Sequence, residues 1–146
     1  MALVQNKKAY FDYEILQKYE AGIELLGFEV KSLKKGQGSL IGSHITIRGN
    51  EAYIINMQIP PYQPTNTPAD YDPLRNRRLL LTKKEIEQLA KEEKTKSLTI
   101  VPLSVYNKGR KLKLDIAIVR GKKKFDKRES IKKRDTDREI RRDLKN

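Results

Sequence analysis

The sequence predicts a mostly β fold with flanking helices, built as one small antiparallel barrel and followed by a disordered basic tail. Two stretches in which apolar residues alternate on either side of a turn, residues 43–59 and 98–119, predict four strands. Between them lies one helix with a complete amino-terminal capping signal. Short antiparallel strands with glycine bends are typical of a small closed or partly open barrel. We therefore expect a folded domain over residues 1–121 and a tail over residues 122–146.

The amino-terminal part is predicted to hold one short helix and one curved strand. Asp12 is a candidate N-cap for the stretch DYEILQKYE, in which Ile15, Leu16 and Tyr19 share one helical face. The following stretch, AGIELLGFEV, is predicted to be extended, with its glycines at bends or bulges. The basic stretch KSLKKGQGS is then expected to be a turn region with room for one helical turn.

The stretch SHITIRGNEAYIINMQI predicts a hairpin that turns at Gly49-Asn50. The side chains expected to point inward are Ile45, Ile47, Tyr53, Ile55, Met57 and Ile59. Five prolines between Pro60 and Pro73 then predict an irregular loop.

The helix between the two hairpins has the strongest local signal. Thr82 and Glu85 form a capping box, and Leu81 and Ile86 have the spacing of a hydrophobic staple. The apolar stripe that follows predicts a helix that ends between residues 94 and 97.

The last hairpin is predicted from LTIVPLSVY and KLKLDIAIV, which are joined at Asn107-Lys108-Gly109. Its expected inward residues are Leu112, Leu114, Ile116 and Ile118, and its expected outward residues are Lys111, Lys113 and Asp115. Pro102 interrupts the first strand, which implies an edge position or a bulge.

The charge of the chain predicts a polyanionic partner. Lysine and arginine total 32 against 19 acidic residues, for a net charge of +13. The tail holds 12 basic and 6 acidic residues, so 20 basic and 13 acidic residues remain in the domain, and both parts are positive. The tail has too few apolar residues to offset the entropy of ordering, although its interspersed charges favour a helix on a polyanion. The alternative is a solubilising appendage.

Several classes of protein are not expected. There is no cysteine, no secretion signal, and no aliphatic run longer than Ile116–Val119, so a soluble cytoplasmic protein without a membrane partner is the expectation. No motif of an enzyme or a metal site is present, so we expect no catalysis and no cofactor. His44 is expected to be an exposed strand residue. Glu20, Glu24 and Glu29 are expected to orient neighbouring lysines and arginines.

Binding features are better represented than catalytic ones. Two lysines stand beside a tyrosine in NKKAY, an acid stands near Lys31 in EVKS, and three arginines precede the capped helix in DPLRNRRLLL. Guanidinium groups suit phosphates, and tyrosine rings suit unstacked bases. No recognition helix for duplex DNA is visible. The pattern favours single-stranded or irregular RNA.

Five segments in order resemble the SmpB family, the SsrA-binding proteins of bacteria. They are NKKAYFDYEI, YEAGIELLGFEVKSLKKG, DPLRNRRLLLTKKEIEQL, LTIVPLSVY and GKKKFDKRESIKKRD. The resemblance implies an oligonucleotide-binding (OB) barrel that binds the tRNA-like part of tmRNA and delivers it to stalled ribosomes for trans-translation. It implies a monomer without catalytic groups, and it implies elongation factor Tu and alanyl-tRNA synthetase as partners through the same RNA.

The resemblance also implies functional residues. The implied RNA-facing surface comprises Asn6, Lys7, Lys8, Glu20, Glu29, Lys31, Ser32, Arg75, Arg77 and Arg78. In the implied ribosome-binding tail, the residues that contact ribosomal phosphates are Lys122, Lys123, Lys124, Lys127 and Arg128. Phe125 would stack on an exposed rRNA base, and Asp126 would orient neighbouring groups. The stretch TPADY lacks a histidine that is frequent in the family, so the contact of that histidine is not carried over to this chain.

Three other functions are compatible with parts of the sequence. A ribosomal or RNA-chaperone protein would coat RNA nonspecifically with the same basic residues. A protein-binding adaptor would use the proline loop and the charged tail. A nuclease would use the carboxylates with Mg²⁺.

Overall fold

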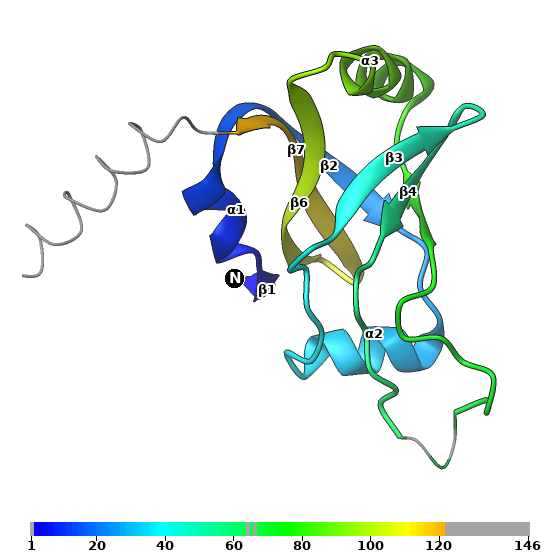
Figure 1. Ribbon diagram of the computed structural model, residues 1–146. Helices are drawn as coiled ribbons and strands as arrows, with labels where there is room; N and C mark the ends of the chain where they lie inside the picture. The colour runs from blue at the N-terminus through cyan, green and yellow to red at the C-terminus, as the bar shows by residue number, and fades with distance from the viewer. Residues whose placement is uncertain (1, 64, 66, 122–146) are drawn as a thin grey trace, which may run out of the picture.

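The computed structural model describes residues 2–63, 65 and 67–121. The basic tail, residues 122–146, lies outside the described residues, so its expected disorder stays a prediction. The elements are β1 Ala2–Gln5, α1 Lys7–Asp12, β2 Tyr13–Ile23, α2 Gly27–Lys34, β3 His44–Arg48, β4 Glu51–Ile55, β5 Arg77–Leu80, α3 Lys83–Glu93, β6 Leu98–Lys108 and β7 Lys111–Gly121 (Figure 1). No helix among the described residues is long and apolar enough to cross a membrane.

The strands form one antiparallel sheet in the order β1-β6-β7-β2-β5-β4-β3. The sheet curls until β3 lies against β6, without hydrogen bonds that would close the ring. Figure 1 shows α2 at one end of this curled sheet and α3 at the other. The expectation of a mostly β, barrel-like fold with flanking helices is confirmed.

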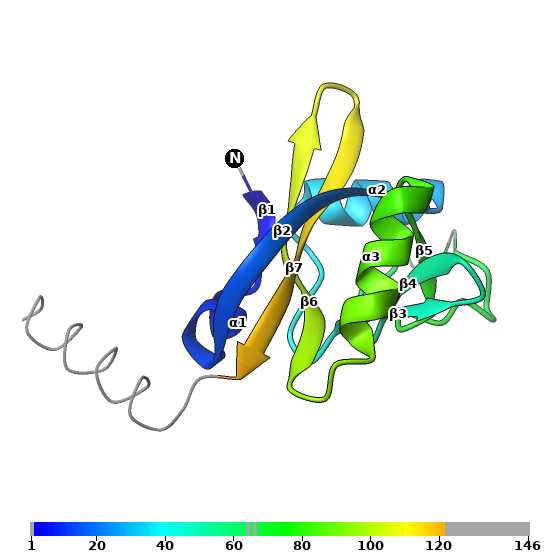
Figure 2. The same ribbon diagram turned by 90° about the horizontal axis from the view of Figure 1, so that it is seen from above.

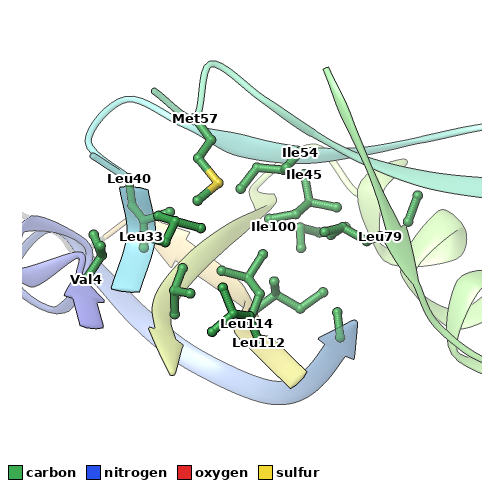
Figure 3. Packing of buried hydrophobic residues seen from close by; sticks show 14 of the residues in the cluster. Val4, Leu33, Leu40, Ile45, Ile54, Met57, Leu79, Ile100, Leu112 and Leu114 are labelled. Carbon is green, nitrogen blue, oxygen red and sulfur yellow. The ribbon is translucent and has the colours of Figure 1, made fainter. Parts of the chain in front are cut away.

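The main core fills the inside of the barrel. Figure 3 shows side chains from the sheet, the amino-terminal strand and α2 converging on this space. Leu33 of α2 and Leu89 of α3 are fully buried, so each helix inserts a leucine into the core. Burying a side chain of this size stabilises the fold by about 1.5–3 kcal/mol. The four inward positions predicted on β7 are also confirmed as buried.

A second, smaller core lies on the outer surface of the sheet. Ala9 of α1 packs against outward residues of β6 and β7, among them Ala117 and Val119. Asn6 caps α1 by accepting from the Ala9 amide, and its own side-chain amide donates to the Pro102 carbonyl at 2.9 Å. Helix α1 therefore covers the outer side of β6 and β7 around Ala117 and Val119.

The helix predicted from Asp12 is wrong. Residues 13–23 form β2, which pairs with β7 from Tyr13 opposite Gly121 to Gly22 opposite Lys113. Its apolar residues fit a helical face only weakly, and pairing with a strand about a hundred residues away decides the conformation. The predicted extended stretch after it is right only to Ile23, because Gly27 begins α2.

The first hairpin is confirmed, but the predicted register of its second strand is wrong. In β4 the buried residues are Ala52 and Ile54, not Tyr53 and Ile55. The stretch AYII is apolar at every position, so alternation could not select a face. Asn56 adopts a φ of 64°, which ends the alternation and returns the next residues to the predicted inward positions.

The other local predictions agree with the structure. The capping box at Thr82 is present, and α3 ends at Glu93. Pro102 lies at an irregularity in the pairing of β6 with β7, so it marks a bulge inside the sheet rather than an edge. Strands β1 and β5 were not predicted, because each has only four residues.

We expect Gly38→Ala to destabilise the fold by about 1–3 kcal/mol. Gly38 has a φ of 130°, and a Cβ there would lie 3.2 Å from the Gln58 carbonyl oxygen and 3.0 Å from Leu33 Cδ2. Gly27→Ala is the matched control, because nothing lies within 4 Å of a Cβ at the start of α2. Urea unfolding measures both free energies, and equal stability of the two variants would contradict the expected strain.

Candidate nucleic-acid interface

One exposed surface is set by the register of four neighbouring strands. Residues directly opposite each other in a sheet point to the same side. The pairs Glu20–Asp115, Gly22–Lys113, Gly22–Leu80 and Tyr106–Lys113 therefore share the outer side. We call this surface the hairpin face, and it comprises Glu20, Gly22, Arg78, Leu80, Tyr106, Lys108, Lys113 and Asp115.

The hairpin face lies on the outer side of the same strands, beyond the part that α1 covers. Figure 2 shows the turn between β6 and β7 far from α1, which lies near the opposite ends of these strands. Outward residues of β7 are apolar under α1 and polar beyond it, as Ala117 and Lys113 illustrate. The residue types along β7 therefore distinguish the part of its outer side that α1 covers from the part that faces solvent.

A fixed carboxylate stands on the hairpin face. The Tyr106 hydroxyl donates to Glu20, and Lys108 Nζ donates to the same carboxylate at 2.9 Å. These hydrogen bonds lower the pKa of Glu20, with the Tyr106 bond the larger cause. Burial and the carboxylates of Glu20 and Asp115 raise the pKa of Tyr106. At neutral pH Glu20 is therefore an ionised, oriented acceptor that suits RNA amino or ribose hydroxyl groups.

An apolar groove with a basic rim lies beside this carboxylate. The groove has a volume of about 290 Å³. Its lining residues are Gly22, Ile23, Leu25, Val30, Leu80, Arg110, Lys111, Leu112 and Lys113. Leu80 is 49% exposed, and Gly22 gives it room because a Cβ there would lie 3.1 Å from Leu80 Cβ. An apolar floor beside cations suits a base or ribose with its phosphate.

The cations of this rim are open to a ligand. Within the described ranges, no carboxylate lies at ion-pair distance from Arg110, Lys111 or Lys113. Arg78 pairs with Glu24 at 3.2 Å and with Glu51 at 3.4 Å, and all three side chains are well exposed. Exposed pairs of this kind contribute about 0–1 kcal/mol, so a phosphate can replace the carboxylates.

A buried ion pair braces the loop between β4 and β5. Glu29 and Arg77 are both fully buried, and all five N–H groups of Arg77 are hydrogen-bonded. Their acceptors are Glu29 Oε2, Tyr71 Oη and the carbonyl oxygens of Met57, Pro73 and Arg75. The partly exposed Arg75 donates its Nε to the same Glu29 carboxylate at 3.1 Å. The loop is therefore tied to α2 at several points.

The pKa values in this brace follow from burial and hydrogen bonding. Burial alone would raise the pKa of Glu29, but the hydrogen bonds from Arg75, the Leu26 amide and Arg77 outweigh burial and keep it below its usual value. Burial and the neighbouring Glu29 raise the pKa of Tyr71 to about 12. Because the folded-state pKa of Glu29 is lowered, its contribution to stability is present at neutral pH and is lost in acid.

The structure separates the predicted RNA-facing residues into two groups. The exposed ones are Lys7, Lys8, Glu20, Lys31 and Arg78, and Arg75 is partly exposed. The buried ones are Asn6, Glu29, Ser32 and Arg77, whose side chains bond within the protein. In this structure those four side chains stabilise the fold and the loop between β4 and β5, and they are not accessible to a ligand.

The acids behave as the sequence predicted. Glu20, Glu24 and Glu29 each pair with a lysine or an arginine, and His44 is exposed. In the described part of the chain, no group of three or more potential metal-ligating side chains was found. The motifs did not point to Tyr106, Lys108 or Leu80. The sequence signal that could have indicated this surface is the group of basic residues at and after the turn Asn107-Lys108-Gly109.

Comparison with known proteins identifies the family. A family profile described as "SmpB protein" matches residues 3–146. The chain belongs to the SmpB family. It is 52% identical to the SsrA-binding protein of Elusimicrobium minutum, covering 97% of this chain and 89% of that protein. It is 49% identical to the SsrA-binding protein of Malacoplasma penetrans, covering 98% of this chain and 97% of that protein.

A solved structure agrees with this assignment to the SmpB family. A chain from the structure described as "tmRNA-SmpB: a journey to the center of the bacterial ribosome" superposes with a TM-score of 0.70 and 43% sequence identity. The match covers 83% of this chain and 85% of that chain. The family resemblance seen in the sequence is confirmed.

We expect Arg77→Lys to destabilise the protein by about 3–5 kcal/mol. Lysine has three donors and a point charge, so it leaves buried carbonyl groups and part of Glu29 unpaired. Arg78→Lys is the control, because that side chain is 44% exposed, and we expect a change within about 0.5 kcal/mol. Urea unfolding of both variants tests the brace, and a mild effect of Arg77→Lys would show that the five donors of the guanidinium are not needed to hold the loop.

Proposed function

We propose that this protein binds the tRNA-like part of tmRNA (SsrA RNA) and delivers it to stalled ribosomes, where incomplete polypeptides are tagged. The observation that carries this proposal is the similarity to SsrA-binding proteins along almost the whole chain. The match to an SmpB chain described with tmRNA and the bacterial ribosome supports the same partners. Elongation factor Tu and alanyl-tRNA synthetase would meet the protein through the same RNA, in the cytoplasm.

The hairpin face has the chemistry that a folded RNA requires. Its groove offers an apolar floor for a base or ribose, and Arg110, Lys111 and Lys113 offer charge to phosphates. The oriented Glu20 carboxylate accepts hydrogen bonds from amino or hydroxyl groups. The protein supplies binding groups and no catalytic step is assigned to it.

The tail is proposed to act on the ribosome. Lys122, Lys123, Lys124, Lys127 and Arg128 would contact ribosomal phosphates. Phe125 would stack on an rRNA base, and Asp126 would orient its neighbours. The domain and the tail then have separate tasks, with the domain holding tmRNA and the tail probing the path of the messenger.

Binding to a transcript of the tmRNA tRNA-like domain tests the function of the domain. We expect the transcript to outcompete unrelated RNA of matched length at moderate salt. Equal competition by the unrelated RNA would support nonspecific coating instead. For Lys111→Gln/Lys113→Gln, the slope of log affinity against log salt should become shallower by roughly 0.7–0.9 per lost phosphate contact.

The matched control for this double variant is Lys83→Gln/Lys84→Gln. Both of its residues are exposed on α3, at the end of the barrel away from the turn between β6 and β7 (Figure 1). It removes the same charge, so an equal loss of affinity would show that only net charge matters.

Removal of residues 122–146 tests the function of the tail. We expect affinity for the tRNA-like transcript to change less than about threefold, although the loss of six net positive charges weakens long-range attraction. Tagging on stalled ribosomes should be lost in a reconstituted translation assay. A truncated protein that still supports tagging, or one that loses most of its RNA affinity, would show that the tail has a different task.

A further inference from the structure

We propose that Lys31, Lys34, Lys35 and Tyr62 form a second RNA contact that binds one unpaired nucleotide. The base stacks on the ring of Tyr62, and the flanking phosphates pair with the lysines. This inference rests on the proposed RNA-binding function and adds a site outside the hairpin face.

Lys31 and Lys34 share one side of α2, and Lys35 follows as the C-cap residue, with its amide hydrogen-bonded to the Lys31 carbonyl. Positions i, i+3 and i+4 of a helix are neighbours, so Lys31 lies beside Lys34 and Lys35. All three side chains are exposed, and within residues 2–63, 65 and 67–121 no carboxylate lies at ion-pair distance from them. The nearby acid of the same helix, Glu29, is buried and occupied by two arginines. The positive charge of this cluster is therefore available to a ligand.

An aromatic ring stands beside the lysine cluster. Lys31 Nζ lies 6.0 Å from the centroid of the Tyr62 ring. The three lysines, Tyr62 and Gln63 line an open depression of about 440 Å³. Clefts that take small ligands are typically about 300–1,000 Å³, so the depression has room for one nucleotide. Cations next to an aromatic face form the usual platform for an unstacked base and its phosphates.

The chain is anchored to α2 directly before Tyr62. Before it, Ser32 Oγ of α2 donates to the Pro60 carbonyl at 2.7 Å. After it, Tyr71 is held by Arg77 at 3.0 Å and packs edge-on against Phe28 with the centroids 4.7 Å apart. An anchor beside the ring lowers the entropy that is lost when a base stacks on it.

Helix α2 separates this site from the hairpin face. Val30 lines the hairpin groove, whereas Lys31, the next residue, lines the depression with Tyr62. An RNA seated on the hairpin face can therefore extend over α2, or a second RNA can occupy the lysine side. Both tmRNA and ribosomal RNA supply unpaired nucleotides between phosphates, so the test must separate these two sources.

The first experiment uses Tyr62→Trp as a reporter, because the chain contains no tryptophan of its own. We expect the emission of the introduced indole to be quenched when the tRNA-like transcript or protein-free 16S rRNA is added. Quenching by the transcript alone assigns the nucleotide to tmRNA, and quenching by rRNA alone assigns it to the ribosome. Unchanged emission with both RNAs, under conditions where each is bound, would overturn the proposal.

The second experiment compares Tyr62→Ala with Tyr62→Phe in binding to the same two RNAs. Loss of the ring should weaken binding of the assigned RNA about five- to hundredfold, whereas phenylalanine keeps the ring and should bind within about twofold of the unchanged protein. Equal affinity of the two variants would overturn the stacking role. If Tyr62→Ala fails to fold, the tryptophan reporter still decides.

The lysines are tested by Lys34→Gln/Lys35→Gln against the α3 control, Lys83→Gln/Lys84→Gln. We expect a shallower salt dependence for the α2 variant only.

The combined outcomes separate the proposals. If the lysine variant weakens binding while Tyr62→Ala binds normally, the cluster acts as general charge, for example toward an acidic peptide, and the nucleotide site is overturned. If the unchanged protein prefers neither RNA over unrelated RNA of matched length, the proposed function itself fails. If every variant of Tyr62 and of the lysines binds both the transcript and rRNA normally, the second RNA contact is overturned and the proposed function stands.

Discussion

The buried pairing of Glu29 with Arg77 is the constraint on which the rest of the structure depends. Two charges lose their water here, so the cost is offset only if every remaining donor finds a partner, and all five donors of Arg77 do. These partners come from α2, the segment just after β4 and the loop before β5. One side chain thus fixes three parts of the chain to each other.

The same pair decides which residues of β5 are exposed. Successive residues of a strand point to opposite sides, so burial of Arg77 places Arg78 and Leu80 outside and Leu79 in the core. The outer side of β5 then joins β2, β7 and β6 in the hairpin face. On the other side of the brace, Tyr62 follows Pro60, which is anchored to α2, and lies beside Lys31. A structural interaction that touches no ligand therefore positions the outer residues of β5 in the hairpin face, and its Glu29 lies on the same helix as Lys31 and Lys34 of the second proposed RNA contact.

Features that depend on neighbours in the sequence could be predicted, and features that depend on distant partners could not. The turn at Gly49-Asn50 and the capping box at Thr82 are local, and both were right. Strand β2 depends on its pairing with β7, and its helix-like spacing gave the wrong conformation. In the site, the family motif selected Arg75, Arg77 and Arg78 together. The structure distinguishes them, because Arg77 is buried against the Glu29 carboxylate whereas Arg78 is exposed and pairs with Glu24.

Under the proposed function, the carboxylate of Glu20 would give the hairpin face a selectivity that net charge cannot give. A protein with a charge of +13 attracts any RNA, and this attraction carries no information about sequence or shape. An ionised acid held in place by Tyr106 and Lys108 repels a phosphate that settles at random beside it. An RNA that presents an amino or hydroxyl group at that point gains a hydrogen bond instead. Discrimination is a difference between two affinities, and in the proposed complex the fixed acid would lower the affinity for the wrong RNA and raise the affinity for the right one.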